Sequence, residues 1–487
     1  MILTENMDKF LSLLDAEIDK HLDATQAVAI KAFSRQFFEA VDLVELRSSH
    51  IRDIYGGLYG AWHLLQHYDS AAAKVQVLNP SYEEHGWQSP YTVIVVHCRD
   101  RAFVIDSLRL ELNRRNLTMH TIHSNVFSVK RDKKGGLQEL GDSQMAAEKG
   151  PSWQVEALIY IAISRHSDPQ VMQELNQTLQ SILAEVEVVV DDFPQMLALA
   201  EGFVAQADER FSPIDAALRK ECKTFMQWLV NDHFTFLGVD HFSQKNASTA
   251  EQSYAIERQQ WGLLKDCQGL EDTGFSSRLD ERADTDEPWQ QCISFEKSSM
   301  RVRVHRDAYP FYIRVKQYNK EGLLEGECRF LGLFTSTAYT DASIQIPLLR
   351  KKLDSIIAHA GDNKDDHDTR ILRRHLEIHP REELFLASVS ELYSTIVAIA
   401  AIQERRQVRL FMRTERNGKF VSCLLFTPKD IYNTELRLRV QRILQEELQA
   451  TAVEFTTNFS ESVLARTYFV FRVDESKHLM YDADLLQ

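Results

Sequence analysis

The stretch that decides the fold is YTVIVVHCRDRAFVIDSLRLELNRRNLTMHTIHSNVFSVKRD, residues 91–132. Residues 91–98 form a continuous β-branched run, which is typical of a strand buried on both faces. Asp100 is placed to cap a following helix, because its carboxylate can accept hydrogen bonds from the N–H groups of the first turn. One apolar stripe of that helix is formed by Val104, Leu108 and Leu112.

The elements predicted around this stretch have the order of a ferredoxin-like sandwich. After the helix, residues 116–132 are predicted to form a second strand and residues 153–164 a third. Asp168 and Pro169 are typical of a helix start, and the valine-rich residues 186–192 indicate one more strand. The resulting order is βαββαβ, which closes an antiparallel sheet against two helices.

The middle of the chain is predicted to be rich in strands. The predicted strands are residues 234–242, 301–307, 311–319 and 326–339, and the acidic residues 276–291 are predicted to form an exposed loop. The triplet Phe-Leu-Gly occurs in the first and in the last of these strands. A glycine inside a strand commonly marks a bulge or a close backbone approach, so the two triplets are predicted to be equivalent strand positions.

The last region repeats an α+β pattern. Residues 408–428 are predicted to form a hairpin, with Asn417-Gly418 as its turn. An amphipathic helix and two further β-rich runs follow, which gives the order ββαββ. Residues 346–403, between the two α+β regions, have helical periodicity.

Composition and charge bound the class of protein. A chain of 487 residues is too long for one core and suggests about three domains. The net charge of −15 repels phosphate backbones, so nucleic acid is not expected as a partner. No apolar run approaches the roughly 20 residues that span a bilayer, and the acidic N-terminus does not resemble a signal peptide. The sequence therefore predicts a cytoplasmic protein without membrane partners.

Patterns that would indicate a metal or redox site are weak. The six cysteines form no CxxC pair, so they are predicted to be buried reduced thiols. His375 and His379 have i, i+4 spacing, but Pro380 follows and no glutamate of an HExxH motif lies between them, so a solvated helix end is predicted. His120 and His123 are three apart on a strand, which predicts opposite faces and structural roles.

Patterns that would indicate a cofactor site or a catalytic site are not found. The chain contains no GxGxxG, no GxxxxGK[ST] and no GxSxG. The densest glycine cluster, residues 55–61, has no strand before it and is predicted to serve helix packing or a kink. The thiol of Cys98 ends a buried strand, and burial disfavours the nucleophilic thiolate. The sequence therefore predicts no catalytic residue, no cofactor and no metal in this segment.

The turn between the first strand and the first helix offers a different chemistry. Free N–H groups at such a turn attract an anion such as a carboxylate. The side chains of Arg99, Arg101 and Arg109 can add charge-assisted hydrogen bonds. The alternative is a turn whose charges are only solvated, and the residues alone leave both readings open.

Several stretches together carry a family resemblance. These are VVHCRDRAFVIDSLRLELNRRNLTMHTIHS, WLVNDHFTFLG, VHRDAYPFYIRVKQYNKEGLLEGECRFLGLFTSTAY with IPLLRKK, ERRQVRLFMRT with GKFVSCLLFTPKDIYNTELRLRVQRIL, and VEFTTNFSESVLAR. In this order they resemble the N-terminal region of the large bacterial NAD-specific glutamate dehydrogenases. The match covers nearly the whole chain from about residue 55 onward. It departs from the family at His123-Ser124, where members usually carry His-Pro, so the local shape of that strand is expected to differ from that of the family.

The resemblance implies the activity of a parent enzyme. The family oxidises L-glutamate to 2-oxoglutarate and ammonia with NAD, in a very long polypeptide that forms homo-oligomers and serves amino-acid catabolism. Its N-terminal region is built of ACT-like modules, and its dehydrogenase domain lies far downstream. The catalytic lysine and the Rossmann domain of the family have no counterpart here, so the chain is expected to be a non-catalytic N-terminal fragment that acts with its own downstream catalytic region.

The predicted fold is therefore α+β, with several ACT-like (ferredoxin-like) α/β sandwiches that have antiparallel sheets and are joined by helical segments. The predicted division is a helical segment at 1–78, a first ACT-like module at 79–192, a second at 193–345 with an inserted acidic loop, a helical linker at 346–403, a third module at 404–475, and the start of a truncated downstream segment at 476–487.

ACT modules bind amino acids at the strand–helix turn, and this gives candidate positions for an effector. Carried onto this sequence, these positions are Arg99, Asp100, Arg101, Asp106 and Ser107. Three functions stay open: a regulatory and oligomerisation region of a dehydrogenase under allosteric control, a free-standing amino-acid-sensing regulator, and an assembly scaffold without a ligand. Sheet edges and helices can pair ACT-like modules without a ligand, so the third function needs no binding site.

Overall fold

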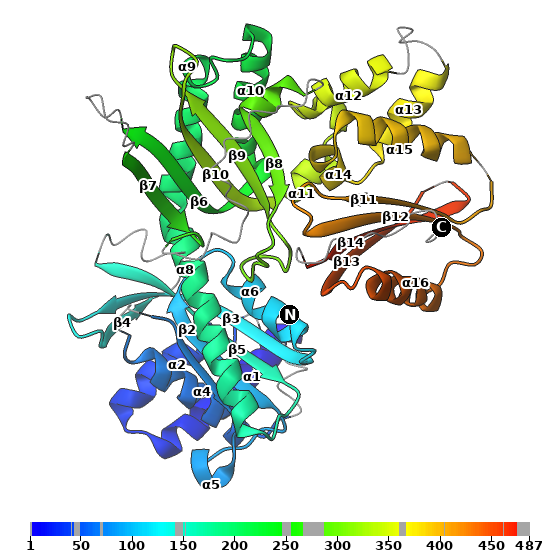
Figure 1. Cartoon of the computed structure of the whole chain (residues 1–487). Coiled ribbons are helices and arrows are strands. Elements are labelled where there is room, and N and C mark those ends of the chain that lie inside the picture. The colour runs from blue at the N-terminus through cyan, green and yellow to red at the C-terminus, as the bar shows by residue number, and fades with distance from the viewer. Residues whose placement is uncertain are drawn as a thin grey trace. The chain divides into compact units, whose positions relative to one another are not determined.

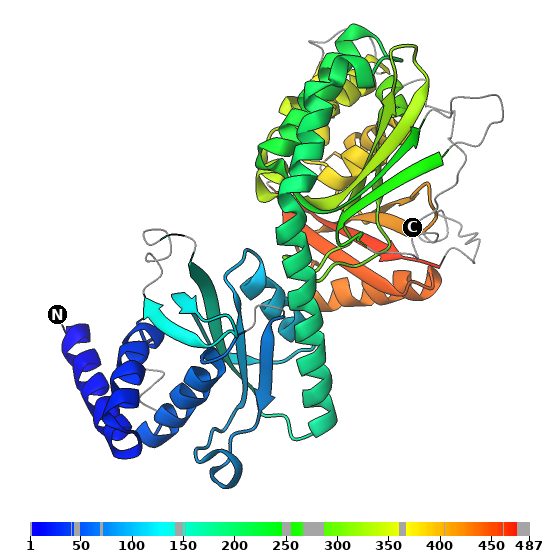
Figure 2. The same cartoon turned by 90° about the vertical axis from the view of Figure 1, so that its left-hand side faces the viewer.

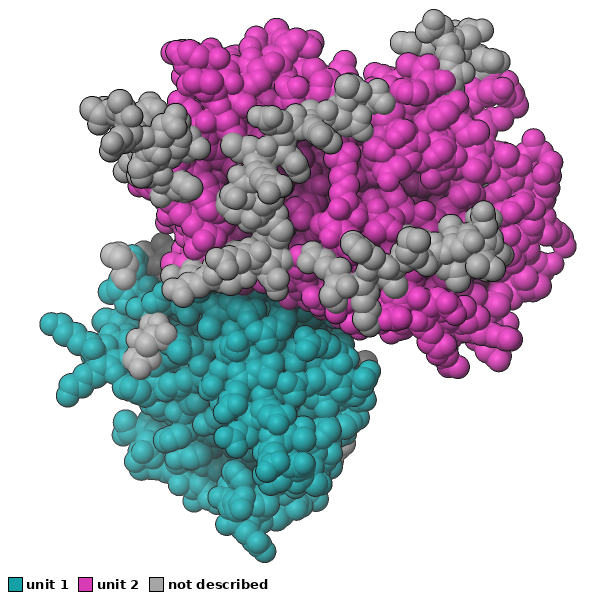
Figure 3. Space-filling model, viewed as in Figure 1, with its two compact units in different colours: residues 1–191, 302–308 teal, residues 192–301, 309–487 magenta. Residues whose placement is uncertain are grey.

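The computed structural model of the protein, drawn in Figure 1, has the predicted α+β fold with antiparallel sheets. The chain forms two compact units, shown in Figure 3. Unit 1 comprises Met1–Asp191 and Val302–Ala308, and unit 2 comprises Asp192–Arg301 and Tyr309–Gln487. The structure describes residues 2–39, 41–42, 49–68, 72–141, 150, 152–245, 255–265, 287–359, 367–403, 405–460 and 462–474, so the predicted start of a downstream segment at 476–487 lies outside it.

Unit 1 is built on a five-stranded antiparallel sheet with the strand order β1-β2-β5-β3-β4. Its strands are β1 (Lys74–Leu78), β2 (Thr92–Arg99), β3 (Met119–Arg131), β4 (Leu137–Gly141) and β5 (Trp153–Ile163). Helix α6 (Val104–Arg114) follows β2, and its predicted apolar stripe is buried. The predicted first strand, helix, second strand and third strand are thus confirmed.

The strand predicted at 186–192 is wrong, because these residues belong to helix α8 (Pro169–Ala205). Val186 and Val189 are buried on the same helical stripe as Leu179 and Ile182. Burial of an apolar stripe at three- and four-residue spacing outweighs the preference of valine for strands. The sheet position that a final strand would take, beside β2, is filled instead by β1, which comes earlier in the chain.

Asp100 does not cap helix α6, which corrects a second prediction. The helix begins at Val104, and its N-cap residue is Phe103, which makes no side-chain capping bond. The backbone N–H of Asp100 donates to the carbonyl of Val155 at 3.1 Å, so Asp100 still pairs with the sheet. Residues 101–103 then form a turn that carries the chain away before the helix starts.

The face of the unit 1 sheet away from α6 is covered by the N-terminal helices, which are blue in Figure 2. These helices are α1 (Ile2–His21), α2 (Ala24–Phe37) and α4 (Ile51–Leu65), and a short helix α5 (Tyr82–His85) follows β1. A Cβ atom added to Gly56 would lie 2.2 Å from Cγ of Trp87, so α4 packs against that ring only because it has no side chain there. This confirms helix packing for the glycine cluster. The segment predicted as helical also contains β1, which corrects that prediction.

A buried ion cluster joins three strands of the same sheet. Glu156 of β5 has no exposed surface, and it accepts hydrogen bonds from Arg131 of β3 at 2.6 and 2.7 Å and pairs with Nε2 of His97 of β2 at 2.7 Å. Arg131 also donates to the carbonyl of Leu65 at the end of α4. Burial raises the pKa of Glu156, but the hydrogen bonds from Arg131 and His97 more than offset this, so the pKa lies below its usual value.

Unit 2 contains a second five-stranded antiparallel sheet, with the order β7-β6-β10-β9-β8. Its strands are β6 (Phe234–Lys245), β7 (Ala255–Gly262), β8 (Ile293–Lys297), β9 (Phe311–Tyr318) and β10 (Leu324–Phe334). The helices before and after it are α9 (Ala207–Arg210), α10 (Ala216–Trp228), a π-helix at Leu229–His233 and α11 (Ser336–Thr340). In the described residues no helix lies between β8, β9 and β10, so this region differs from the ACT-like module predicted at 193–345.

The two Phe-Leu-Gly triplets lie opposite each other in this sheet. Leu331 of β10 pairs with Gly238 of β6, and the register shifts between Leu331 and Gly332. A Cβ atom added to Gly332 would lie 2.2 Å from the carbonyl oxygen of Thr235. The predicted bulge with a close backbone approach is confirmed.

Two further predictions for the middle region need correction. Residues 301–307 form no strand and make only an isolated bridge between Val302 and Ala308. The predicted exposed loop lies outside the described residues up to 286, and its last part forms a 3-10 helix at Pro288–Gln291 in which Trp289 is buried. An indole ring that packs into the core outweighs the polarity of its neighbours in the sequence.

The C-terminal region has the predicted order ββαββ, in a sheet with the strand order β11-β12-β14-β13. Its elements are β11 (Arg409–Thr414), β12 (Phe420–Pro428), α16 (Thr434–Glu447), β13 (Ala452–Phe459) and β14 (Leu464–Arg472). The turn between β11 and β12 contains Gly418 at φ +68°, a left-handed conformation that glycine adopts without strain.

The region predicted as a helical linker is part of the core of unit 2. Its helices are α12 (Leu349–His359), α13 (His367–Glu377), α14 (Arg381–Leu386) and α15 (Val389–Ile402), after a 3-10 helix at Ser343–Gln345. Ile356, Leu376 and Phe385 are buried in one cluster with Phe330 of β10 and Leu424 of β12. In the described part of the chain, no helix is long and apolar enough to cross a membrane.

Replacing Gly332 by Ala is expected to lower the free energy of unfolding by about 2–3 kcal/mol, because the new Cβ would clash with the carbonyl of Thr235. The matched control is Gly202→Ala in α8, where no atom lies within 4 Å of the added Cβ and alanine favours the helix. Urea unfolding followed by circular dichroism measures both. Equal stability of the two variants would contradict the close approach.

Candidate functional site

The predicted effector positions lie at one end of the unit 1 sheet, but they do not surround an open pocket. Arg101 forms an ion pair with Asp191 of α8, and a second, at 3.7 Å, with Glu187. Arg99 is partly exposed and Asp100 is exposed. Ser107 is fully buried in the first turn of α6. The five residues therefore do not form one site. Arg101 pairs with α8, Asp100 faces solvent, and Ser107 is buried within α6.

A segment from elsewhere in the chain, Val302–Ala308, covers the start of α6. The N–H of His305 donates to Oγ of Ser107 at 3.1 Å, and the imidazole lies with its centre 4.7 Å from that of the Phe103 ring. Nδ1 of His305 lies 3.6 Å from Oδ2 of Asp106, which is an ion-pair distance but too long for a hydrogen bond. Two of the predicted effector residues thus contact the protein's own chain.

The rest of the segment is held against α8. Arg303 forms an ion pair with Glu185 and donates to Oγ of Ser181 at 3.2 Å, while Val304 is completely buried. Phe103 and His305 both have left-handed backbones, with φ of +71° and +70°. Such conformations cost about 1 kcal/mol or more each in a residue other than glycine, so the surrounding contacts must outweigh that strain.

A small cavity lies at the strand–helix turn, between the end of β2 and helix α8. The cavity beside Cys98, Arg99 and Arg101 has a volume of about 10 Å³, roughly that needed for one water molecule. Burial raises the pKa of the Cys98 thiol to about 12, and the carboxylate of Asp100 adds to this. The thiol therefore stays protonated and is a poor nucleophile, as predicted.

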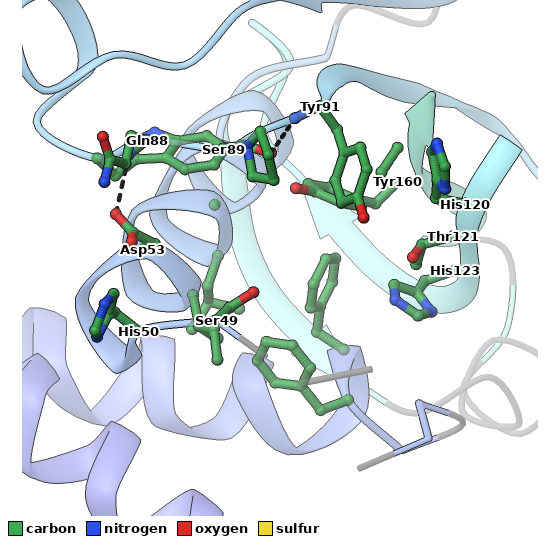
Figure 4. A pocket seen from close by; sticks show the side chains of 18 residues that line it. Ser49, His50, Asp53, Gln88, Ser89, Tyr91, His120, Thr121, His123 and Tyr160 are labelled. Carbon is green, nitrogen blue, oxygen red and sulfur yellow. Dashed lines mark hydrogen bonds between the residues drawn. The ribbon is translucent and has the colours of Figure 1, made fainter. Parts of the chain in front are cut away.

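A larger cavity, of about 700 Å³, lies on the other face of the same sheet, between α4, the residues that precede β2, and strands β3 and β5. Figure 4 shows Tyr91, His120, Thr121, His123 and Tyr160 on the strand side of this cavity. The rings of Tyr91 and His120 stack with centres 4.4 Å apart. Burial raises the pKa of Tyr160 well above its usual value. The cavity therefore offers flat aromatic walls with a phenol and imidazoles at its surface.

The two histidines of this cavity correct the prediction that they point to opposite faces. Met119 pairs with Ile163 and Thr121 with Ala162, so His120 is an extra residue in β3. Such a bulge changes the alternation of side chains along a strand, and both His120 and His123 line the cavity. A bulge depends on pairing with a distant strand, so nothing in the local pattern of the sequence indicated it.

His379 also differs from its prediction, because it is buried rather than solvated. Only 7% of its surface is exposed, and burial lowers its pKa to about 4. The nearby carboxylate of Glu383 opposes this shift, but Glu383 is already engaged by Arg413 at 2.7 and 2.9 Å and by the hydroxyl of Tyr468 at 3.0 Å. In the part of the chain that the structure describes, no group of three or more His, Cys, Asp and Glu side chains is arranged to hold a metal ion.

Comparisons with known proteins match separate parts of the chain. Three protein-family models match the chain: the glutamate dehydrogenase ACT1 domain at residues 33–179, its helical motif 1 at 346–405 and its ACT2 domain at 409–487. The first match begins within α2, so it includes helices that cover the sheet of unit 1 as well as the sheet itself.

Curated proteins similar to the chain are NAD-specific glutamate dehydrogenases. The chain is 38% identical over 478 residues to that of Halomonas elongata and 36% identical over 481 residues to that of Pseudomonas aeruginosa. Each match covers 98% of this chain and 29% of the relative. The protein of Mycobacterium tuberculosis is 27% identical over 422 residues, which are 86% of this chain and 24% of that protein. The chain thus spans less than a third of the length of these relatives.

The burial of His379 predicts a loss of stability in acid. In the unfolded chain a histidine binds a proton below about pH 6.5, whereas in the folded protein His379 binds one only near pH 4, so falling pH favours unfolding over this range. The loss is about 3 kcal/mol between pH 7 and pH 4. His379→Gln should lack this part of the pH dependence, as measured by urea unfolding at several pH values. The control His367→Gln, at an exposed position in α13, should keep it; identical curves for all three proteins would contradict a buried neutral imidazole.

Proposed function

Because the chain belongs to the NAD-specific glutamate dehydrogenase family, we propose that it is a non-catalytic regulatory and assembly region of such an enzyme. The proposed parent reaction converts L-glutamate, NAD and water to 2-oxoglutarate, ammonia and NADH, in the cytoplasm. NAD would act in the parent enzyme and not in this segment. The ACT1 and ACT2 matches support regulation, and the share of the relatives that the chain spans supports a downstream catalytic region as its partner.

The observation that carries the regulatory proposal is the segment Val302–Ala308 on the strand–helix turn. An effector that binds Asp106 and Ser107 would have to displace this segment, because His305 contacts both residues. The segment then has two states, seated on the turn or displaced from it. A ligand shifts the populations of these states according to the difference between its affinities for them.

The assembly proposal is supported by apolar side chains at an edge strand. β13 is at the edge of the C-terminal sheet, and Phe455 and Phe459 on it are 47% and 59% exposed. An edge strand presents unpaired backbone groups, and exposed aromatic residues beside it favour pairing with another chain. We therefore propose that copies of the protein associate through this edge as a homo-oligomer.

An amino-acid effector is expected to bind saturably and to raise the melting temperature of the chain, as ligands of the native state do. Calorimetry with the twenty amino acids, 2-oxoglutarate and NAD tests this. Asp106→Ala should weaken binding about tenfold or more, through loss of a charge that contacts the ligand. His305→Gly should strengthen it, because the variant keeps the left-handed backbone but loses the ring contact that holds the competing segment.

Each other result of this titration has a defined meaning. Equal affinity of the wild type and His305→Gly would contradict competition with the segment. No saturable ligand at all would favour the assembly scaffold, and binding of NAD would contradict a segment without a cofactor site.

The edge-strand proposal predicts a concentration-dependent oligomer in sedimentation velocity experiments. Phe459→Glu should raise its dissociation constant at least about tenfold, because a buried charge replaces an aromatic contact. Leu323→Glu, which changes a side chain that is 65% exposed in the turn before β10, should have no effect. A monomeric wild type, or equal effects of the two variants, would exclude this edge as the interface.

A further inference from the structure

A second cavity, of about 440 Å³, lies in unit 2 beside the C-terminal sheet. One wall is formed by residues 377–382, which join α13 to α14, and the other by strands β13 and β14. The charged side chains that line it are Glu377, Arg381, Glu382, Glu454 and Arg466. None of the residues that line this cavity belongs to the turn between β2 and α6 or to the aromatic cavity of unit 1.

Arg466 is a partly buried cation without a counter-ion. It lies in β14 opposite Asn458 of β13, on the sheet face that also carries Tyr468. Among the residues that the structure describes, it makes no hydrogen bond or ion pair. Burial lowers its pKa, and no carboxylate counteracts this. Burial is the main cause that lowers the pKa of His375 and His379, and the positive charge of Arg466 lowers both further.

Arg413, on the same face of the sheet, differs from Arg466 because it has a counter-ion within the protein. Its guanidinium binds both oxygens of Glu383 at 2.7 and 2.9 Å, which raises its pKa above the usual value. The protein thus supplies an anion to Arg413 and none to Arg466. A guanidinium that is partly removed from water gains from a bidentate carboxylate, so Arg466 is suited to bind one from outside.

The carboxylates of the cavity are engaged elsewhere. Glu377 accepts hydrogen bonds from the N–H of Ser343, and Glu382 pairs with Nζ of Lys297 at 2.6 Å. Glu454 lies 3.7 Å from the same Nζ, and its Oε1 has no hydrogen-bond partner among the described residues. The cavity therefore presents an unpaired cation together with an incompletely paired carboxylate. A dianion such as phosphate is disfavoured by the three carboxylates of the lining.

We propose that this cavity binds a small amino acid as its zwitterion, with the carboxylate on Arg466 and Asn458 and the ammonium group toward Glu454. The ligand carboxylate compensates the charge of Arg466, and the ammonium group adds a second partner to Glu454, which has Nζ of Lys297 at 3.7 Å. A molecule with only one of these groups leaves the other charge of the site unsatisfied, and that is the basis of the selectivity. The proposal is independent of an effector at the turn of α6, since none of its residues belongs to unit 1.

The test is calorimetry of the whole chain with probes that differ in charge and spacing. The zwitterions are L-alanine, glycine, β-alanine, 4-aminobutyrate and 5-aminopentanoate, which separate the two charged groups by increasing lengths. Propionate carries the carboxylate alone, propylamine the ammonium group alone, and inorganic phosphate is the competing anion. One zwitterion should bind at least about tenfold more tightly than propionate, propylamine and phosphate.

Three variants assign the binding to this site. Arg466→Gln should abolish binding and, because it removes an uncompensated charge, raise the melting temperature of the ligand-free protein. Arg406→Gln, at an exposed arginine paired with Asp430, should leave binding unchanged. Asp106→Ala, at the turn of α6, should also leave it unchanged.

The outcomes separate this site from the one in unit 1. Loss of binding in Asp106→Ala but not in Arg466→Gln would overturn the present proposal and support the effector site at the turn of α6. Equal binding of propionate and the zwitterions would overturn the role of Glu454. A lower melting temperature of ligand-free Arg466→Gln would show that Arg466 is a structural cation, and absence of binding by every probe would exclude the site.

Discussion

The fold of unit 1 depends on the ion cluster of Glu156, Arg131 and His97. A carboxylate without exposed surface is stable only if its partners satisfy it, and removal of one partner from such a pair costs about 3–5 kcal/mol. Because its members come from β2, β3 and β5, the cluster is satisfied in only one register of the three strands. Arg131 extends the same constraint to the end of α4. The positions of the α6 turn and of the aromatic cavity, on opposite faces of the sheet, both follow from this fixed register.

Much of the fold could be predicted from local patterns. The strand at 91–98, the stripe of α6 and the ββαββ order of the C-terminal region follow from periodicity and turn residues, which act over a few positions. The errors arise where distant parts of the chain decide the outcome. Residues 186–192 have the composition of a strand, but the sheet position beside β2 is already filled by β1, and their valines serve the buried stripe of α8.

The candidate sites show the same division between local and distant causes. The strand–helix turn with Asp106 and Ser107 lies where the sequence indicated, because a strand followed by an amphipathic helix defines such a turn. The segment that lies on this turn could not be predicted, since His305 is 198 residues from Ser107 in the sequence. The two histidines of the aromatic cavity likewise depend on a bulge set by pairing with β5. His379 is buried because other parts of the chain pack over it, and the sequence around it does not indicate this.

The seating of Val302–Ala308 in unit 1 has a consequence for how the protein can vary and be divided. Loops between adjacent strands of a sheet ordinarily tolerate insertions and cuts. The connection from β8 to β9 is an exception, because seven of its residues, buried Val304 among them, belong to a unit that is otherwise encoded before residue 192. A fragment that ends before residue 192 would lack Val302–Ala308, which is part of unit 1. Unit 1 is thus contiguous in space but not in the gene, and changes in loop length near residue 300 are constrained by a helix encoded two hundred positions earlier.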